Sequence, residues 1–118
     1  MKKLHLKLND EFKNFVVSRK ETKDLYHQEK GVQYLIRFPN GYGASIIKKH
    51  GSYGYERDLW ELALFTNRDG TGKWTLEYTE LVEYDVLGCL TDEQVNIVLK
   101  YIMEGDVNTD INIYGYDD

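Results

Sequence analysis

The segment VQYLIRFPNGYGASIIKK (residues 32–49) decides the fold. Its first part alternates in polarity with a period of two, which indicates a β-strand, at Val32, Tyr34, Ile36 and Phe38. Pro39-Asn40-Gly41 then interrupts the pattern, and Asn-Gly favours a tight turn because both residues tolerate positive φ. Residues 44–49 are apolar at first and then basic, as expected of a return strand. The segment therefore predicts a β-hairpin.

A second hairpin is predicted further along the chain. Residues 59–66 are apolar on both faces apart from Glu61, which is typical of a central strand. A turn follows at residues 67–72, and apolar residues alternate again at Trp74, Leu76 and Tyr78. Residues 32–79 thus predict a mostly antiparallel sheet of about four strands in two hairpins, with a Gly/Tyr-rich loop at residues 50–58 between them.

The clearest helix lies at residues 91–104. Thr91 and Gln94 have the spacing of a capping box, and Gly105 is placed to end the helix in the left-handed conformation. One apolar face follows from the spacing of Val95, Val98, Leu99 and Ile102. We expect this face to pack on the sheet, which makes the fold class α+β.

The N-terminal segment, residues 1–30, is polar and strongly charged. Asn9 or Asp10 is placed to cap a helix over residues 10–19, whose apolar face would carry Phe12, Phe15 and Val16. This helix would cover the second face or an edge of the sheet. We expect one domain over residues 1–105 and an acidic tail over 106–118, either an edge strand or a segment that folds on a partner. The exposed sheet edges leave a monomer and a homodimer as alternatives.

Composition narrows the class of protein. The chain has 118 residues, 42% hydrophobic and 30% charged, as is usual for a single globular domain. No apolar run is long enough to cross a membrane, and polar residues interrupt any signal-peptide core after the basic start. The single cysteine, Cys89, excludes an intramolecular disulfide framework. A cytoplasmic location is expected.

The charge is divided unevenly along the chain. Residues 1–59 carry twelve Lys/Arg and seven Asp/Glu, a net of +5, whereas residues 60–118 carry three and thirteen, a net of −10. The acidic half would repel polyanions and attract a basic surface. Duplex DNA is therefore disfavoured as a partner, because neutralising its phosphates needs a net basic footprint.

No catalytic motif is present. The histidines at positions 5, 27 and 50 lack the spacing of metal ligands, and Cys89 has the apolar neighbours of a core residue. Glu83 and Asp85 would share a face of an extended segment, but nothing indicates a cleft around them. The glycine-rich stretches match no nucleotide-binding fingerprint. The sequence predicts no enzyme, no cofactor and no metal.

One group of residues favours a binding surface. Between Tyr42 and Trp60, aromatic side chains alternate with basic ones, and Tyr, Trp and Arg are enriched at the centres of protein interfaces. The predicted protein-binding residues are Tyr42, Lys48, Lys49, Tyr53, Tyr55, Arg57 and Trp60. Two alternatives are that Trp60 and some tyrosines belong to the core, or that single-stranded nucleic acid stacks on Tyr42, Tyr53 and Tyr55 beside Lys48 and Lys49.

Three blocks of the sequence, FPNGYGASIIK (38–48), GSYG (51–54) and DLWELA (58–63), with YDVLG (84–88) and LTDE (90–93) after them, resemble small uncharacterised proteins of phages and prophages of Gram-positive bacteria. The resemblance covers about residues 34–104, and the longer basic N-terminal segment and the acidic tail depart from it. It implies a phage accessory protein in the bacterial cytoplasm, without known catalytic residues.

The leading hypothesis is therefore a non-enzymatic protein that binds and modulates a host or phage protein. The contact surface would be either the Tyr/Lys-rich loop region or the acidic C-terminal half. Mimicry of nucleic acid by the acidic half would need one connected face containing Glu77, Glu80, Glu83, Asp85, Asp92 and Glu93. The alternatives are a single-stranded nucleic-acid-binding protein and a small enzyme with no recognisable motif.

Overall fold

The computed structural model describes residues 2–83 and 85–115. The hairpin expected around Asn40-Gly41 is present, because β2 (Glu29–Arg37) pairs antiparallel with β3 (Tyr42–Lys48). Gly41 has a φ of 86°, and the Asn40 side chain accepts from the Tyr42 amide at 3.0 Å. The same side chain donates to the Ile102 and Met103 carbonyls at the end of α2 (Asp92–Met103), so this turn also holds the helix.

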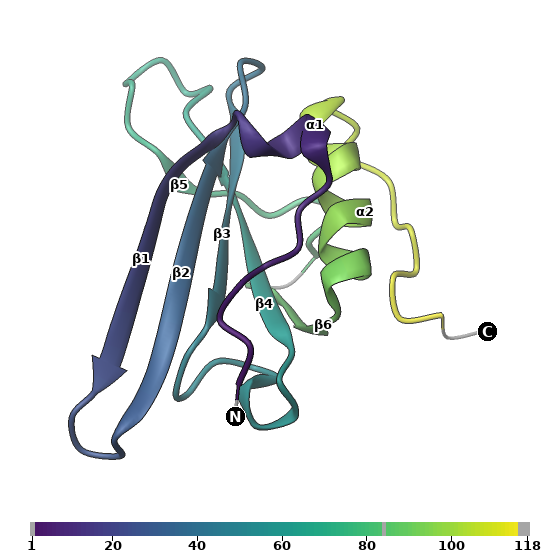
Figure 1. The fold of residues 1–118 in the computed structure, drawn as a ribbon. Helices are drawn as coiled ribbons and strands as arrows, with labels where there is room; N and C mark the ends of the chain where they lie inside the picture. The colour runs from purple at the N-terminus through teal and green to yellow at the C-terminus, as the bar shows by residue number, and fades with distance from the viewer. Residues whose placement is uncertain (1, 84, 116–118) are drawn as a thin grey trace.

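The sheet has more strands than the four expected. Six strands form one antiparallel sheet in the order β1-β2-β3-β4-β5, with β6 also paired to β4 (Figure 1). The additional strands are β1 (Val16–Asp24) and β6 (Leu87–Leu90). The second hairpin is formed by β4 (Trp60–Thr66) and the two-residue β5 (Thr75–Leu76). The broad α+β class is confirmed, and the strand count is corrected.

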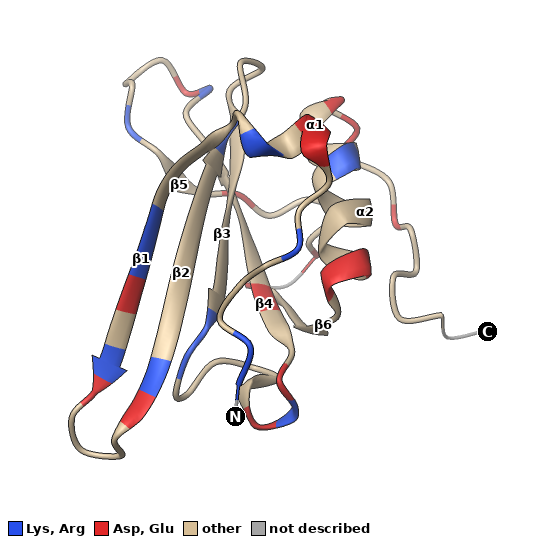
Figure 2. Cartoon of the chain, viewed as in Figure 1, with Lys and Arg blue, Asp and Glu red and all other residues tan. Residues whose placement is uncertain are grey.

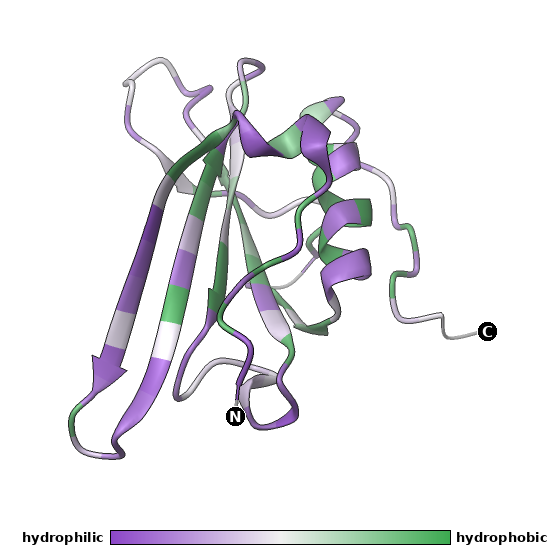
Figure 3. Cartoon of the chain, in the orientation of Figure 1, coloured by the Kyte–Doolittle hydropathy of each residue, from purple (hydrophilic) through white to green (hydrophobic). Residues whose placement is uncertain are grey.

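The expected N-terminal helix over residues 10–19 is wrong beyond its first turn. Only α1 (Asp10–Lys13) is helical, and the chain then enters β1. Strand β1 is hydrophilic over most of its length (Figure 3), since it forms the edge of the sheet and most of its side chains are exposed. An edge strand gains its backbone hydrogen bonds from its neighbour, here β2, and needs no apolar pattern of its own.

The core lies between one face of the sheet and α2. Helix α2 buries the four apolar residues predicted for this face, Val95, Val98, Leu99 and Ile102. The capping box of Thr91 and Gln94 is formed, and Gly105 has a φ of 75°, as expected. A short 3₁₀ helix, η1 (Tyr55–Arg57), lies in the loop between β3 and β4. None of the helices in the described ranges has the length and apolar character that a membrane span requires.

Two terminal segments complete the packing. The extended segment before α1 crosses the front of the sheet, and the segment after α2 runs back beside that helix (Figure 1). The described part of the acidic tail contains no strand, although it packs on the domain. Val107 is buried and its carbonyl accepts from the Leu81 amide at 3.0 Å. The tail's last residues, 116–118, lie outside the described residues.

Candidate functional site

Three of the seven residues predicted to bind a partner are buried. The exposed fractions of Trp60, Lys48 and Tyr55 are 0%, 2% and 4%. Trp60 points inward from the central strand β4, and its indole N–H donates to Asp92 Oδ1 at 2.6 Å. Alternation along β3 and β4 turns Lys48 and Trp60 to the buried face of the sheet. The predicted surface must be corrected accordingly.

Lys48 lies in a closed cluster that we call the Lys48 cluster, formed by Lys3, Lys48, Asp58 and Trp60. The Lys48 ammonium donates to the Lys3 carbonyl at 2.8 Å and to Asp58 Oδ1 at 2.9 Å, and lies 4.2 Å from the centroid of the Trp60 ring. Burial alone would raise the pKa of Asp58. Hydrogen bonds from Lys48 and from the Lys3 amide outweigh that cost and hold this pKa below its ordinary value. The Lys48 ammonium is therefore paired inside the protein, where it stabilises the fold and is not accessible to a partner.

The predicted tyrosines do not form one platform. Tyr55 donates from its hydroxyl to the Lys30 carbonyl at 2.8 Å. Tyr42 is half-buried, and the Arg68 guanidinium lies 4.9 Å from the centroid of its ring. Tyr42 begins β3 whereas Tyr53 follows the end of that strand, so the two are separated by about 20 Å of strand at roughly 3.3 Å per residue. Only Tyr53, at 68% exposure, offers an open ring from the predicted loop.

Two of the predicted residues that remain exposed, Tyr53 and Arg57, line a hollow that we call the Tyr53 pocket. This pocket has a volume of about 580 Å³ and is lined by Tyr53, Arg57, Asp85, Val86, Gly88, Cys89 and Tyr114. It joins the loop after β3, the approach to β6 and the C-terminal tail. Lys49 is also exposed, but it does not line the pocket.

Close backbone packing shapes the Tyr53 pocket. The Cys89 amide donates to the Tyr53 carbonyl at 3.2 Å, and Tyr114 donates from its hydroxyl to the Gly88 carbonyl at 2.6 Å. A Cβ atom at Gly88 would lie 2.5 Å from the Cβ of Tyr53, so only glycine fits there without a shift. These contacts hold the backbone of Tyr53 against residues 88–89.

Cys89 is not the core residue that its apolar neighbours predicted. It is partly exposed, lines the Tyr53 pocket and has a φ of 56°. Positive φ is uncommon for residues other than glycine, and here it accompanies the close approach to the loop at Gly54. No sequence pattern around Cys89 indicates that conformation, because the contact comes from a segment about 35 residues earlier.

The acidic residues of the second half are divided between different surroundings. Asp92 lies at the start of α2, where it accepts from Trp60 and from the Lys7 amide. Of the six residues named for nucleic-acid mimicry, only Asp85 lines the Tyr53 pocket. Figure 2 shows acidic residues in separate loops, at both helices and in the strands rather than along one element. Asp92 is thus committed to the fold and unavailable to such a face.

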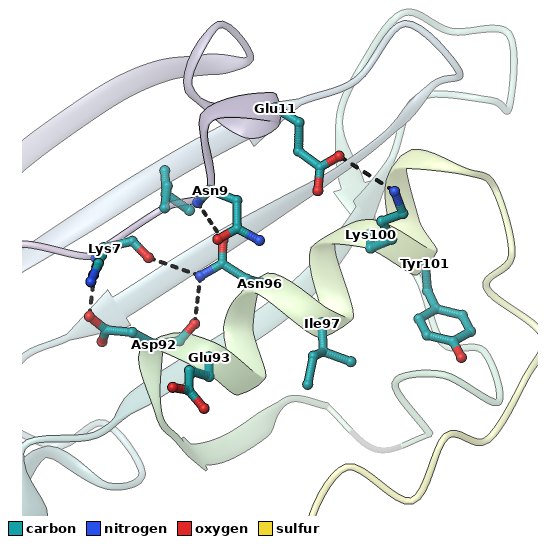
Figure 4. Close-up of a pocket in the computed structure, with 10 residues that line it drawn as sticks. Lys7, Asn9, Glu11, Asp92, Glu93, Asn96, Ile97, Lys100 and Tyr101 are labelled. Carbon is teal, nitrogen blue, oxygen red and sulfur yellow. Dashed lines mark hydrogen bonds and ion pairs between the residues drawn. The ribbon is translucent and has the colours of Figure 1, made fainter.

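A second hollow, of about 510 Å³, lies between the N-terminal segment and α2 (Figure 4). Its centre is the buried amide of Asn96, whose Oδ1 accepts from the Asn9 amide at 2.8 Å. The Nδ2 of Asn96 donates to the Lys7 carbonyl at 2.9 Å and to the Asp92 carbonyl at 2.8 Å. The Asn96 amide is thus fully hydrogen-bonded, and it joins the N-terminal segment to α2.

The fold also brings together two histidines that their spacing in sequence left apart. The rings of His27 and His50 stack with centroids 3.7 Å apart and planes at 21°. Asp24 and Glu29 each lie within 3.2 Å of one ring nitrogen. The sequence contains no local signal for this pair, because the β1–β2 turn carries one ring and the segment after β3 carries the other.

Comparisons of the chain with protein-family models, with curated proteins and with solved structures found no match.

Proposed function

We propose that this protein is a non-enzymatic accessory protein of the phage type, which binds and modulates a host or phage protein through the Tyr53 pocket. The observation that carries the proposal is that the exposed Tyr53 ring lines a hollow together with Arg57. Tyrosine and arginine supply large contact areas with few rotatable groups, which is why they are enriched at interface centres.

The charge of Arg57 supports the Tyr53 pocket as the binding site. Its side chain is exposed, and no carboxylate among the described residues forms an ion pair with it within 4.0 Å. A guanidinium presents five donors in a planar fork that suits a carboxylate. We therefore expect the partner to place an acidic side chain on Arg57 and an apolar side chain against the ring of Tyr53.

The pocket also joins the two surfaces that the sequence offered as alternatives. Tyr53 and Arg57 come from the Tyr/Lys-rich loop, whereas Asp85 and Tyr114 come from the acidic half. Asp85 is exposed and would accept from a donor of the partner. One partner could thus contact both regions at once, through charges of opposite sign on the two sides of the pocket.

The alternative of single-stranded nucleic acid has less support. Of the five residues that it requires, Lys48 and Tyr55 are buried and Tyr42 packs under Arg68. Stacking of successive bases needs several open aromatic faces along a basic groove. Tyr53 and Lys49 alone would provide one stacking face and one phosphate contact.

The test places a photo-crosslinking phenylalanine analogue at position 53 in one sample and at position 78 in another. Tyr78 is a matched control, since it is 54% exposed and lies outside the pocket. Both proteins are irradiated in a nuclease-treated lysate of a Gram-positive bacterium. We expect a single protein adduct from position 53 that is absent from position 78. Equal adducts at both positions, or none, would overturn the proposal.

The captured protein is then purified and titrated with wild-type and Arg57→Ala proteins. Loss of a central arginine contact should weaken binding at least about 10-fold, which corresponds to about 1.4 kcal/mol. Tyr78→Ala should leave the affinity unchanged. Capture that disappears with nuclease would support the nucleic-acid alternative and contradict ours, as would an affinity that is indifferent to Arg57→Ala.

A further inference from the structure

The end of the β1–β2 hairpin carries a cluster of side chains with metal-binding groups, which we call the His27–His50 cluster and which contains Asp24, His27, Glu29 and His50. Asp24 and Glu29 are paired across the hairpin, where β1 ends and β2 begins. His27 lies in the turn between them, and His50 reaches the same place from the segment after β3.

Local hydrogen bonds hold the turn in position. Asp24 Oδ1 accepts from the amides of Tyr26 and His27, each at 2.9 Å, and lies 3.2 Å from Nδ1 of His27. These bonds to the carboxylate hold the pKa of Asp24 below its ordinary value, with the bond from the His27 amide as the largest cause. The Asp24 carboxylate therefore lies directly beside an imidazole nitrogen.

The second histidine has an equivalent arrangement. Nδ1 of His50 lies 3.1 Å from Oε2 of Glu29. Each ring in the stacked pair thus has a carboxylate at one nitrogen. Histidines that bind metals commonly have a carboxylate as hydrogen-bond partner or fellow ligand, since it orients the ring and raises the basicity of the nitrogen that binds.

The distances bring potential ligand atoms close to one another. One nitrogen or oxygen atom from each of Asp24, His27 and His50 lies within 4.8 Å of the other two. A second group of atoms, from Glu29, His50 and Glu56, meets the same limit and shares His50. Around a tetrahedral ion with bonds of about 2.0–2.1 Å, ligand atoms stand about 3.4 Å apart. The rings of His27 and His50 are stacked, so they must also turn out of the stack before a nitrogen of each points at one ion. Both rings lie outside the strands, so this movement does not disturb the sheet.

We propose that Asp24, His27 and His50 bind one divalent transition-metal ion, with zinc as the chemical type. Two imidazoles and one carboxylate suit zinc and its neighbours, whereas magnesium and calcium prefer oxygen ligands alone. Three protein ligands leave a fourth position for water, or for Glu29 if that side chain turns toward the ion.

The ion would enter directly from solvent and would connect two loops. The exposed fractions of the Asp24, His27 and His50 side chains are 31%, 43% and 32%, so no closed core has to open. Binding links the β1–β2 turn to the segment that precedes Tyr53. The site involves none of the residues that line the Tyr53 pocket and stands independently of the proposed binding function.

The test uses tag-free protein, zinc chloride as the first probe and cobalt chloride as a spectroscopic probe. Calorimetric titration of the wild type with zinc should give one equivalent bound, and cobalt should give the visible absorption of a four-coordinate site. His50→Ala removes the ligand shared by both groups and should weaken zinc binding at least about 100-fold, because losing an outer partner alone costs 10–100-fold. His5→Ala is the matched control, an exposed histidine outside the cluster, and should bind zinc as the wild type does.

Circular dichroism of each variant would establish that the fold is retained, which the exposure of the cluster leads us to expect. Side-chain resonances of His27 and His50 should shift on addition of zinc while those of His5 stay in place. The proposal is overturned if the wild type binds no zinc below about 100 μM, if His50→Ala binds as well as the wild type, or if magnesium competes with zinc at equal concentration.

Discussion

The Lys48 cluster and the His27–His50 cluster are both charged, and the loop between β3 and β4 contributes to each. His50 stands near the start of that loop and Asp58 at its end. Lys48 is 2% exposed, and its ammonium has a carbonyl, a carboxylate and an aromatic face as partners. The His27 and His50 side chains are about a third exposed or more, and their rings stack on each other.

The two clusters differ in whether their charged and ring-nitrogen groups already have all their partners within the protein. A buried ammonium must be paired inside the protein, so the Lys48 ammonium has no position left for an external ligand. Two imidazoles with a carboxylate at one nitrogen each still have a second ring nitrogen to offer. Burial with complete pairing thus identifies a charge that supports the fold, whereas exposure with spare ligand atoms identifies one that can bind something else.

The largest expected effect comes from breaking the pair in the Lys48 cluster. Asp58→Asn removes the counter-charge of a buried ammonium, and should lower the free energy of unfolding by about 3 kcal/mol. Asparagine tolerates the φ of 60° at this position, so the backbone contributes little to the loss. Urea denaturation measures the change.

Two further variants complete this test. Lys48→Met in the Asp58→Asn background should recover part of the loss, because an apolar side chain of similar length no longer requires a counter-charge. Glu80→Gln changes an exposed carboxylate and should stay within about 0.5 kcal/mol of the wild type. If the free energy of unfolding of Asp58→Asn also lies within about 0.5 kcal/mol of the wild type, the pair of Lys48 and Asp58 is not needed for stability.

A smaller effect should distinguish two glycines of the loop between β3 and β4. Gly54 has a φ of 99°, and a Cβ there would lie 2.8 Å from the Cα of Cys89. Gly51 has a φ of 90° with no heavy atom within 4 Å of such a Cβ. Gly51→Ala should cost about 1 kcal/mol for backbone strain alone, and Gly54→Ala about 1 kcal/mol more for the clash. Equal midpoints in urea would contradict the close packing on Cys89.

A still smaller effect of Asp58→Asn is expected on the way stability falls with decreasing pH. The pKa of Asp58 is lower in the folded protein than its ordinary 3.8, so the unfolded state binds protons first as the pH falls. The stabilisation is present above pH 3.8 and is lost as the pH drops through the folded value. Urea midpoints between pH 5 and pH 2 should therefore fall less steeply in Asp58→Asn than in the wild type. Parallel curves would count against the pairing.

The smallest effect is expected at the exposed cluster. His27→Ala without added metal should change the free energy of unfolding by less than about 0.5 kcal/mol, since exposed ion pairs contribute little. With zinc in excess, the wild type should melt at a higher temperature and His27→Ala should gain less. A large loss of stability without metal would place this cluster in the same class as the Lys48 cluster.

Local patterns in the sequence were enough for several elements. The Asn40-Gly41 turn, the capping box at Thr91 and the terminating Gly105 all formed as predicted, because each depends on contacts within a few residues. The strand β1 was missed, since its residues form a strand only when β2 supplies the pairing. Its exposed, charged side chains carry no period that could have indicated this.

The predicted binding surface also contains residues whose position follows from local sequence and residues whose position depends on distant segments. The polarity of Lys48 suggested exposure, yet Ala44, Ile46 and Lys48 share one face of β3, so its inward position could have been inferred from the alternation. Trp60 likewise shares the buried face of β4 with Leu62 and Leu64, so alternation indicates its inward position too. Tyr55 gave no such indication, because it lies in η1 outside any strand, and its hydroxyl donates to the Lys30 carbonyl of a distant segment.

The sequence by itself therefore determined the α+β class, the central hairpin and the helix with both of its ends, because hydrophobic period and turn chemistry act locally. The tertiary structure decided which charges are buried, which aromatic side chains are open, and that His27 and His50 meet. Those outcomes depend on strand pairing and on loops that bring distant residues within contact distance, and no local pattern records such distances.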